Sequence, residues 1–322
     1  MKPQIYVLLA LISPVVAAVS GCDNKQRAVH PDTVATELVV IAAGEFIMGS
    51  DKVDTAGMKE RYGFVKPLYL DEHPQHKVQL GAYRIEKLEV TNGQYKKFVT
   101  STGRREPFGW TQNGYNLVPK RLEATGVEDL RWIATDYFHL DMDTRVMDKP
   151  ALLQAMYRSQ EAMDKLPVTD VSFHDASDYC AWVGRRLPTE AEWEKAARGS
   201  DGREFPWGND WNPELLNTGD DTDYEEGIAP VGKFEQSKSP YGVYDMAGNV
   251  WEWVDSWYAA YPGSDHQNEQ FGNKFRIIRG GGGGIGHYAI SQVFRAAARQ
   301  YADPSMASGD VGFRCAADGA QG

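Results

Sequence analysis

The sequence predicts an α+β fold, a single domain with much irregular structure, and three observations lead to this class. Short strand-like stretches alternate with well-marked amphipathic helices along the chain. The composition is rich in glycine (32 residues) and in aromatic side chains (9 Trp, 16 Tyr and 12 Phe), which is typical of loop-rich folds held together by large buried rings. From residue 37 onward there is no break in composition and no internal repeat, so we expect one domain over residues 37–318.

The N-terminus predicts an exported, lipid-anchored protein. Residues 1–21 contain one lysine and then a short apolar stretch that ends in small residues, which is typical of a cleaved signal peptide rather than of a membrane span. The stretch VSGC, which ends at Cys22, resembles the bacterial lipobox, whose cysteine is lipidated and becomes the mature N-terminus. We therefore expect attachment to a membrane of the bacterial cell envelope through Cys22, with the protein periplasmic or surface-exposed. Residues 22–36 are polar and without periodicity, and are predicted to be a tether.

The net charge limits the classes of binding partner, and the cysteine count indicates a disulfide. A formal net charge of −11 argues against a nucleic-acid-binding protein, which needs clustered Lys and Arg. Once Cys22 is set aside as the lipidation site, two cysteines remain, Cys180 and Cys315. An even pair in an oxidising compartment predicts a disulfide.

The first half of the domain contains strands and one clear helix. Four short strands are predicted: 38–41, 45–48, 78–80 and 83–85. Thr91 is the expected N-cap of a helix whose apolar residues recur at helical spacing over 95–99. Residues 106–165 show little pattern, and we expect long loops there with one helix over 151–164.

Two further helices have well-defined ends. An amphipathic helix is expected over 172–184. The next one begins after Thr189 with a capping box and ends at Gly199. We expect Arg185 and Arg186 to pair with the acidic start of this helix. After residue 200 the chain is predicted to consist of turns, short strands and aromatic residues.

Six motifs occur in an order that closely resembles the formylglycine-generating enzyme (sulfatase-modifying factor) family. They are GEFIMGS, EVTNGQYKKFV, PVTDVSFHDASDYCAWVGRRLPTEAEWEKAARG, FPWGND, YGVYDMAGNVWEWVDSWY and GFRCA. The resemblance covers roughly residues 37–318 and implies the C-type-lectin-like topology of that family. It also implies a structural disulfide between Cys180 and Cys315.

The resemblance further implies two structural calcium sites. The residues that match them by position are Asn217, Thr218, Asp223 and Glu225 for the first site, and Asp245, Gly248, Val250 and Glu252 for the second. Calcium prefers carboxylate and carbonyl oxygens, which acidic turns supply. The alternative is that these are solvated acidic loops.

The segment RGGGGGIGHYAIS, residues 279–291, marks the position of the family's active site. Its glycines satisfy a dinucleotide fingerprint, but the 36 residues that follow Gly286 are expected to form turns and one short strand, which excludes the βαβ unit that such a fingerprint needs. In the resemblance, Gly286 and Ser291 stand where the family has its two copper-binding cysteines. Because Cu(I) prefers thiolates, we expect copper to be absent and copper-dependent cysteine oxidation to be lost.

Three function classes remain open. In the first, the 282–302 surface binds an unknown protein or small molecule, with His287, Tyr288 and Tyr301 as candidate contacts. One form of this class is a variable binding protein that is the target of a diversity-generating retroelement. We favour the first and third classes over the second. In the second, the chain is an enzyme, either a non-copper oxidoreductase similar to the pyoverdine-maturation members or a formylglycine-generating oxidase with an unrecognised site. In the third, it is an accessory protein of a surface or secretion machinery.

Overall fold

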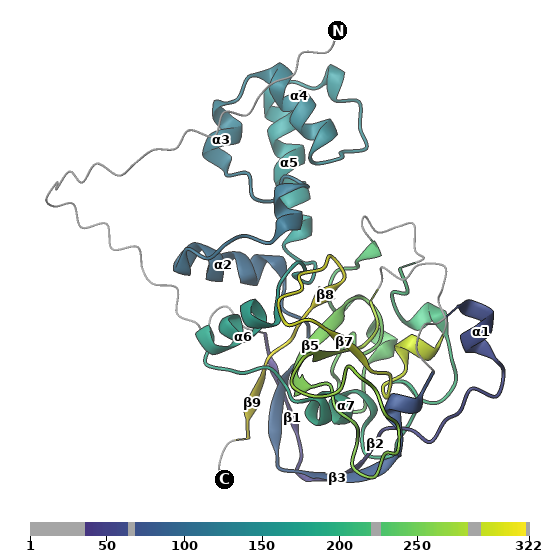
Figure 1. Cartoon of the computed structure of the whole chain (residues 1–322). Coiled ribbons are helices and arrows are strands. Elements are labelled where there is room, and N and C mark those ends of the chain that lie inside the picture. Colours follow the sequence, from purple (N-terminus) through teal and green to yellow (C-terminus); the bar gives the residue numbers. More distant parts are fainter. Residues whose placement is uncertain (1–35, 64–67, 220–226, 283–290, 320–322) are drawn as a thin grey trace, which may run out of the picture.

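The computed structural model describes residues 36–63, 68–219, 227–282 and 291–319 (Figure 1). Within these ranges the strands form three small sheets. One sheet has the order β1–β4–β9 and is antiparallel: β1 Leu38–Ile41, β4 Tyr83–Glu86 and β9 Ala316–Asp318. Another pairs two antiparallel strands: β2 Gly44–Met48 and β3 His76–Leu80. The third has the order β7–β6–β5–β8: β7 Gln300–Ala302, β6 Arg276–Arg279, β5 Trp251–Trp257 and β8 Val311–Gly312.

The four strands predicted in the first half of the domain are all present, and three of them are one or two residues longer than expected. The prediction of one short strand after the glycine segment was wrong, because β7, β8 and β9 all lie there. Each of these strands has two or three residues and is completed by pairing with a strand from elsewhere in the chain. Such short strands carry too little periodicity to be recognised from sequence.

Three helices have the reciprocal hydrogen bonds of a capping box at their N-termini: α2 Asn92–Thr102, α6 Phe173–Trp182 and α7 Glu190–Arg198. Thr91 and Thr189 are the N-caps of α2 and α7, as the sequence predicts, and Ser172, where the helix over 172–184 was expected to start, is the N-cap of α6. Arg186 pairs with Glu192 in the first turn of α7, with 2.7 Å between Nη2 and Oε1. The expectation for Arg185 was wrong, because it pairs with Glu86 of β4 instead.

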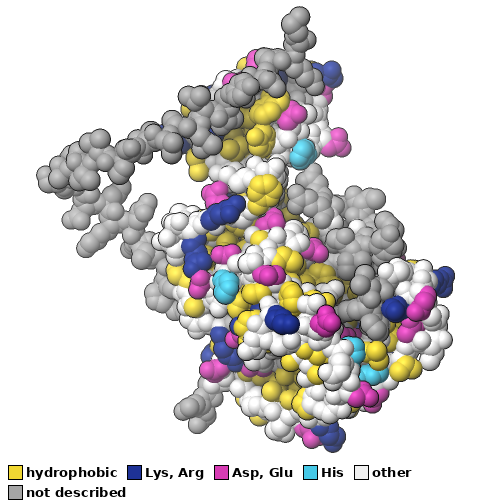
Figure 2. Space-filling model, viewed as in Figure 1, with side chains coloured by type: hydrophobic (Ala, Val, Ile, Leu, Met, Phe, Trp, Pro, Cys, Tyr) yellow, Lys and Arg dark blue, Asp and Glu magenta, His cyan; other side chains and the backbone are white. Residues whose placement is uncertain are grey.

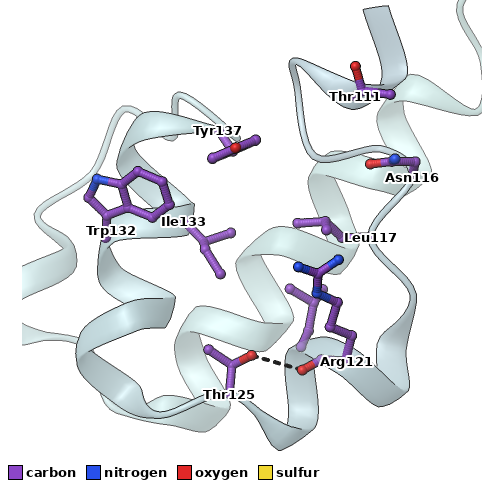
Figure 3. A pocket seen from close by; sticks show the side chains of 9 residues that line it. Thr111, Asn116, Leu117, Arg121, Thr125, Trp132, Ile133 and Tyr137 are labelled. Atoms are coloured by element: carbon purple, nitrogen blue, oxygen red, sulfur yellow. Dashed lines mark hydrogen bonds between the residues drawn. The ribbon is translucent and has the colours of Figure 1, made fainter. Parts of the chain in front are cut away.

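Residues 119–163 form a helical lobe, which corrects the prediction of long loops there. Its helices are α3 Pro119–Ala124, α4 Val127–Asp136 and α5 Lys149–Met163. They share a hydrophobic cluster separate from the rest of the core, made of Leu122, Leu130, Ala134, Phe138, Leu152 and Met156. Figure 2 shows hydrophobic side chains gathered on this lobe, at the top of the view. A pocket opens between α3, α4 and the preceding segment, residues 111–117 (Figure 3).

The main core lies on both faces of β5. Trp253 belongs to a cluster with α2 and α6, whereas Val254 belongs to a second cluster with α7. Because successive side chains of a strand point to opposite faces, β5 is buried on both sides, and its first four residues are buried without exception. The remaining short elements are α1 Met58–Tyr62 and 3-10 helices at Leu70–Glu72, Phe108–Thr111, Thr144–Val146, Pro213–Leu215, Glu235–Ser237 and Ser291–Phe294. No helix of the described ranges has the length and apolar character that crossing a membrane requires.

Candidate functional site

The glycine segment begins as a tightly packed turn directly after β6. Gly281 has φ +79°, and a Cβ there would lie 2.6 Å from Cδ1 of the buried Phe294. A Cβ on Gly282 would lie 2.6 Å from Cδ1 of Trp251. Glycine is therefore required at both positions, by conformation and packing at Gly281 and by packing alone at Gly282. The predicted site residues Gly286, His287 and Tyr288 lie outside the described residues.

The far end of the segment is held by side chains from another part of the chain. Ser291 is half-buried and begins the 3-10 helix Ser291–Phe294. The Tyr69 hydroxyl donates to Gln292 Oε1 at 2.5 Å, and Gln292 Nε2 donates to Ser291 Oγ at 3.0 Å. Burial raises the pKa of Tyr69 above its usual value of 10.0, so its hydroxyl keeps the proton that it donates. The two described ends of the segment are thus fixed on the body of the domain.

Tyr301 does not project from the surface as expected. It lies half-buried on β7, and its ring stacks on Tyr258 with 4.4 Å between ring centroids. It also contacts the ring of Phe275 at 5.2 Å. Strand β7 was not predicted from the sequence, so the residues that pack on either face of it were unknown. The burial of this ring could therefore not be predicted.

Buried ion pairs stabilise the residues on either side of the glycine segment. Three arginines that flank the glycine segment are 5% exposed or less, and each one pairs with a buried glutamate of α7 or of the segment before β3: Arg279 with Glu194, Arg295 with Glu72, and Arg299 with Glu190. Arg295 contacts both carboxylate oxygens of Glu72, at 3.0 and 2.9 Å from Nη1. Paired charges of this kind hold their neighbours in one arrangement, because breaking a buried pair leaves an unpaired charge. These carboxylates therefore act as a structural frame.

The residues expected at the first calcium site are only partly described. Asn217 and Thr218 are buried, whereas Asp223 and Glu225 lie outside the described residues. Asn217 Oδ1 accepts from the Gly219 backbone N–H at 2.9 Å, so one of its lone pairs is already used.

The second expected site lies beside the first one, because the Asn249 backbone N–H donates to the Asn217 carbonyl at 2.9 Å. Positive φ angles at Asp245 and Gly248 curl the chain there, and Val250 is fully buried. Among the described residues no set of three or more His, Cys, Asp or Glu side chains is arranged to hold a metal ion. A cation at this turn would thus depend on backbone carbonyls as well.

Glu252, the expected side-chain ligand, is already engaged by other side chains. Its Oε2 accepts from Arg314 Nε at 2.7 Å and from Trp193 Nε1 at 2.9 Å, and its Oε1 accepts from Arg314 Nη2 at 2.6 Å. All three residues are fully buried. This geometry weakens the match of Glu252 to a calcium ligand.

Glu89, which sequence reasoning missed, has a buried carboxylate oxygen at this turn that is not engaged by a hydrogen bond from the described residues. It is fully buried beside Asp245, and its Oε2 has no hydrogen-bond donor among the described residues. Burial and the Asp245 carboxyl hold the pKa of Glu89 well above its usual value of 4.5. When Glu89, Asp245 and Glu252 are all ionised, Arg314 offsets only one of their three charges, and two negative charges remain. A cation would favour the ionised form of both the Glu89 and the Asp245 carboxyls. A buried carboxylate oxygen without a hydrogen-bond donor, 3.9 Å from Arg314 Nη2 and next to a second buried carboxyl, fits one divalent cation.

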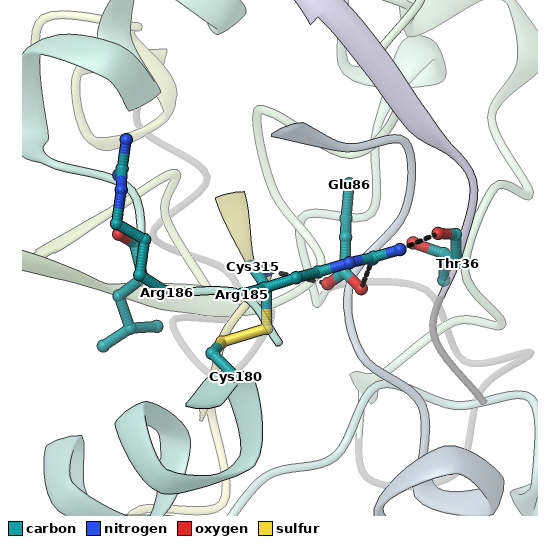
Figure 4. The surroundings of a disulfide bond; sticks show 7 residues. Thr36, Glu86, Cys180, Arg185, Arg186 and Cys315 are labelled. Carbon is teal, nitrogen blue, oxygen red and sulfur yellow. Dashed lines mark hydrogen bonds and ion pairs between the residues drawn. A yellow bond between two sulfur atoms is a disulfide. The ribbon is translucent and has the colours of Figure 1, made fainter. Parts of the chain in front are cut away.

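The disulfide expected between Cys180 and Cys315 is present, and it joins α6 to the residue directly before β9 (Figure 4). Both cysteines are fully buried. Beside the disulfide, Glu86 accepts from the Cys315 backbone N–H at 2.7 Å and pairs with Arg185 at 2.5 Å. The disulfide takes up both cysteines of the described residues, so none of these residues has a free thiol.

Comparison with known proteins identifies relatives along almost the whole chain. A family model described as the sulfatase-modifying factor enzyme 1-like domain matches residues 25–319. The formylglycine-generating enzyme of Bos taurus is 31% identical over 315 residues, which cover 88% of this chain and 75% of the relative. The inactive C-alpha-formylglycine-generating enzyme 2 of Bos taurus is 33% identical over 297 residues, which cover 87% of each protein. Among solved structures, PvdO from Pseudomonas aeruginosa has a TM-score of 0.56 at 24% identity and covers 88% of this chain and 94% of that chain, a likeness that shows the fold.

Proposed function

The chain belongs to the sulfatase-modifying factor enzyme 1-like family, and on this basis we propose that it is a binding or accessory member of the family that does not oxidise cysteine with copper. The observation that carries the proposal is the use of its cysteines. Cys180 and Cys315 form the disulfide, and the third cysteine of the sequence is Cys22, far from the glycine segment in the chain. Cu(I) is held by soft sulfur ligands, and the glycine and serine at positions 286 and 291 supply none.

The proposed binding surface is the 282–302 segment. Its described ends are rigid: Gly282 packs on Trp251, and Gln292 is bonded to Tyr69. The side chains between these ends that we propose as contacts are His287 and Tyr288, which lie outside the described residues. The relative whose name includes the word inactive shows that this family has members without the oxidase activity. The ligand of the present chain would be a protein or a small molecule.

We propose that the chain is held at a membrane of the bacterial cell envelope through lipid on Cys22. The support is the sequence of residues 1–22, which lie outside the described residues. Acyl chains on one cysteine would tether the domain without any spanning helix.

Structural calcium is the proposed cofactor, held at the second site by Asp245 and Glu89 with the carbonyls of Gly248 and Val250. Bound there, calcium would stabilise the ionised forms of Glu89 and Asp245 and fix the turn between β5 and the segment before it. The test is thermal unfolding with calcium and with a chelator. Calcium should raise the Tm of the wild-type protein and leave the Tm of Glu89→Gln nearly unchanged. Glu45→Gln, which changes an exposed carboxylate paired with Lys77, is the matched control. An equal response of Glu89→Gln and wild type would contradict this ligand set.

The copper proposal is tested by restoring the missing thiols. Wild-type protein and the double variant Gly286→Cys with Ser291→Cys are titrated with Cu(I), and oxygen consumption is followed with a cysteine-containing peptide of the sulfatase type. Wild type should bind no stoichiometric copper, whereas the double variant should bind one equivalent. Ser291→Cys alone is the control, because one thiolate does not make the pair. Stoichiometric copper and turnover in wild type would refute the proposal and restore the oxidase alternative.

A further inference from the structure

The helical lobe contains a pocket that has no part in the proposed function of the 282–302 segment. It has a volume of about 240 Å³ and lies between α3, α4 and residues 111–117. Figure 3 shows Trp132 and Tyr137 on one side and Leu117 and Arg121 on the other. Binding pockets in proteins are concave and mostly apolar, with a few polar groups that orient the ligand. The volume is below the usual range of about 300–1,000 Å³ for drug-sized ligands, so this pocket would take a small one.

One wall of the pocket consists of aromatic rings that are costly to leave in water. Trp132 is 56% exposed and Tyr137 is 36% exposed, although both are large apolar side chains. Their rings pack edge to face with 5.3 Å between centroids, which fixes the shape of the wall. Ile133 extends the apolar surface between them and α3. A ligand with an apolar body would cover surface that solvent now contacts.

The neutral polar groups of the pocket are largely used within the lobe. The Thr125 hydroxyl donates to the Arg121 carbonyl at 2.8 Å, and the Thr111 hydroxyl donates to the Phe108 carbonyl at 2.8 Å. The Asn116 side-chain amide donates to Glu106 at 3.0 Å. These groups therefore have little capacity left to donate to a ligand.

Arg121 is the charged group among the described residues that line the pocket. Its guanidinium makes no hydrogen bond, ion pair or ring contact with any residue that the structure describes, and no acidic side chain is among the described residues that line the pocket. Figure 3 shows it reaching from α3 toward Leu117, along the wall that faces the two rings. The five N–H groups of a guanidinium match the two oxygens of a carboxylate, which is the pairing that arginine favours over other cations.

From this combination we infer that the pocket binds a small apolar carboxylate, with its aryl or alkyl body against Trp132, Tyr137 and Ile133 and its carboxylate on Arg121. The aromatic wall selects the apolar body, and the unpaired guanidinium selects the negative charge. The inference does not depend on the function of the glycine segment, so either one can fail without the other.

The test is isothermal titration of the purified protein with three probes: phenylpropanoate, phenylpropylamine and acetate. Phenylpropanoate should bind saturably. Phenylpropylamine has the same ring and chain with the opposite charge, and should bind more weakly by up to about fivefold, the largest factor that one exposed charge contact supplies. Acetate has the charge without the body and should show no saturable binding. No saturable binding of phenylpropanoate, or equal binding of the amine, would overturn the inference.

Variants identify the pocket as the site. Arg121→Gln should weaken phenylpropanoate binding about fivefold and should make the acid and the amine bind alike. Trp132→Ala should weaken the binding of both probes. The matched controls are Lys120→Gln, which removes an exposed cation from the same helix outside the pocket lining, and Val146→Ala, which trims a side chain of the lobe that is 82% exposed. All four residues are exposed, so the variants should unfold at the wild-type temperature. If Lys120→Gln weakens binding as much as Arg121→Gln does, the assignment to this pocket is wrong.

Discussion

Four glycine-to-alanine substitutions can separate the two reasons for glycine at the start of the glycine segment, backbone conformation and close packing. At Gly281 the backbone has φ +79° and an added Cβ would meet Phe294 at 2.6 Å. At Gly282 the Cβ would meet Trp251 at 2.6 Å without a positive φ. At Gly242 the φ of +82° is present with no atom within 4 Å, and at Gly309 neither condition holds. The four positions therefore include one glycine with both constraints, one with the packing contact alone, one with the positive φ alone, and one with neither.

The expected costs follow from these contacts. A left-handed conformation costs an alanine about 1–2 kcal/mol, which is the whole effect expected for Gly242→Ala. Overpacking costs about 1–3 kcal/mol, which is the whole effect expected for Gly282→Ala. Gly281→Ala combines both, and we expect a loss of about 2–5 kcal/mol because Phe294 is fully buried and has little room to move. Gly309→Ala should leave stability unchanged or raise it by about 0.4–1 kcal/mol, because alanine restricts the unfolded chain.

The assay is equilibrium unfolding in urea, followed by tryptophan fluorescence, with the free energy of unfolding compared among the four variants and wild type. Equal m-values would show that the variants unfold from the same native state. If Gly281→Ala is no less stable than Gly309→Ala, the packing of the segment against Phe294 is refuted. If Gly282→Ala alone is without cost, the contact with Trp251 is refuted while the conformational argument stands.

Three further predictions concern the frame of the domain. Replacing both Cys180 and Cys315 by alanine should lower the free energy of unfolding by about 5 kcal/mol in the loop-entropy model, since the disulfide spans 135 residues; a loss below about 1 kcal/mol in urea unfolding would contradict that estimate. Burial alone would raise the pKa of Glu194, but Arg279 and Arg198 lower it below its usual 4.5, so the stability that this carboxylate supplies is complete above pH 4.5 and is lost as the pH falls through the folded-state pKa. Glu194→Gln should therefore cost about 3–5 kcal/mol at neutral pH, and a series of unfolding curves should show its difference from wild type shrinking in acid; a constant difference would argue against the pairing. Leu130→Ala, in the fully buried centre of the helical lobe, should cost about 2–5 kcal/mol and should speed hydrogen exchange in α3 to α5 more than in α7, an inequality whose absence would show that the lobe has no core of its own.

The elements that could be predicted from sequence are those with local signals. The capping boxes at Thr91, Ser172 and Thr189 depend on residues three positions apart, and the structure has helices at all three places. In contrast, the N-cap of α4 is Gly126, which has no side chain to cap a helix, and its buried residues Leu130 and Ala134 find their partners only when α5 packs on them. The helical lobe was missed for that reason.

In the candidate site, too, features with a local sequence signal could be predicted, whereas contacts between distant residues could not. The disulfide follows from counting cysteines, and the tight turn at Gly281 agrees with a glycine run. Glu89 could not be identified, because nothing near it in the sequence indicates that it faces Asp245, which is far along the chain. The engagement of Glu252 by Arg314 was equally hidden, since both partners fit the family motifs when read separately.

The order β1–β4–β9 makes three features of the fold depend on one short stretch of the chain. The closing strand β9, the sulfur of Cys315 and the counter-charge Arg314 all lie within residues 314–318, and 229 residues separate Cys315 from Glu86 of β4, to which its backbone N–H donates. A chain cut before residue 311 would leave an open sheet edge at β4, a lone thiol at Cys180 and an unpaired charge at Glu252. The domain therefore cannot complete its native structure in parts, and a product truncated at this point would expose a strand edge, a thiol and a buried charge at the same time.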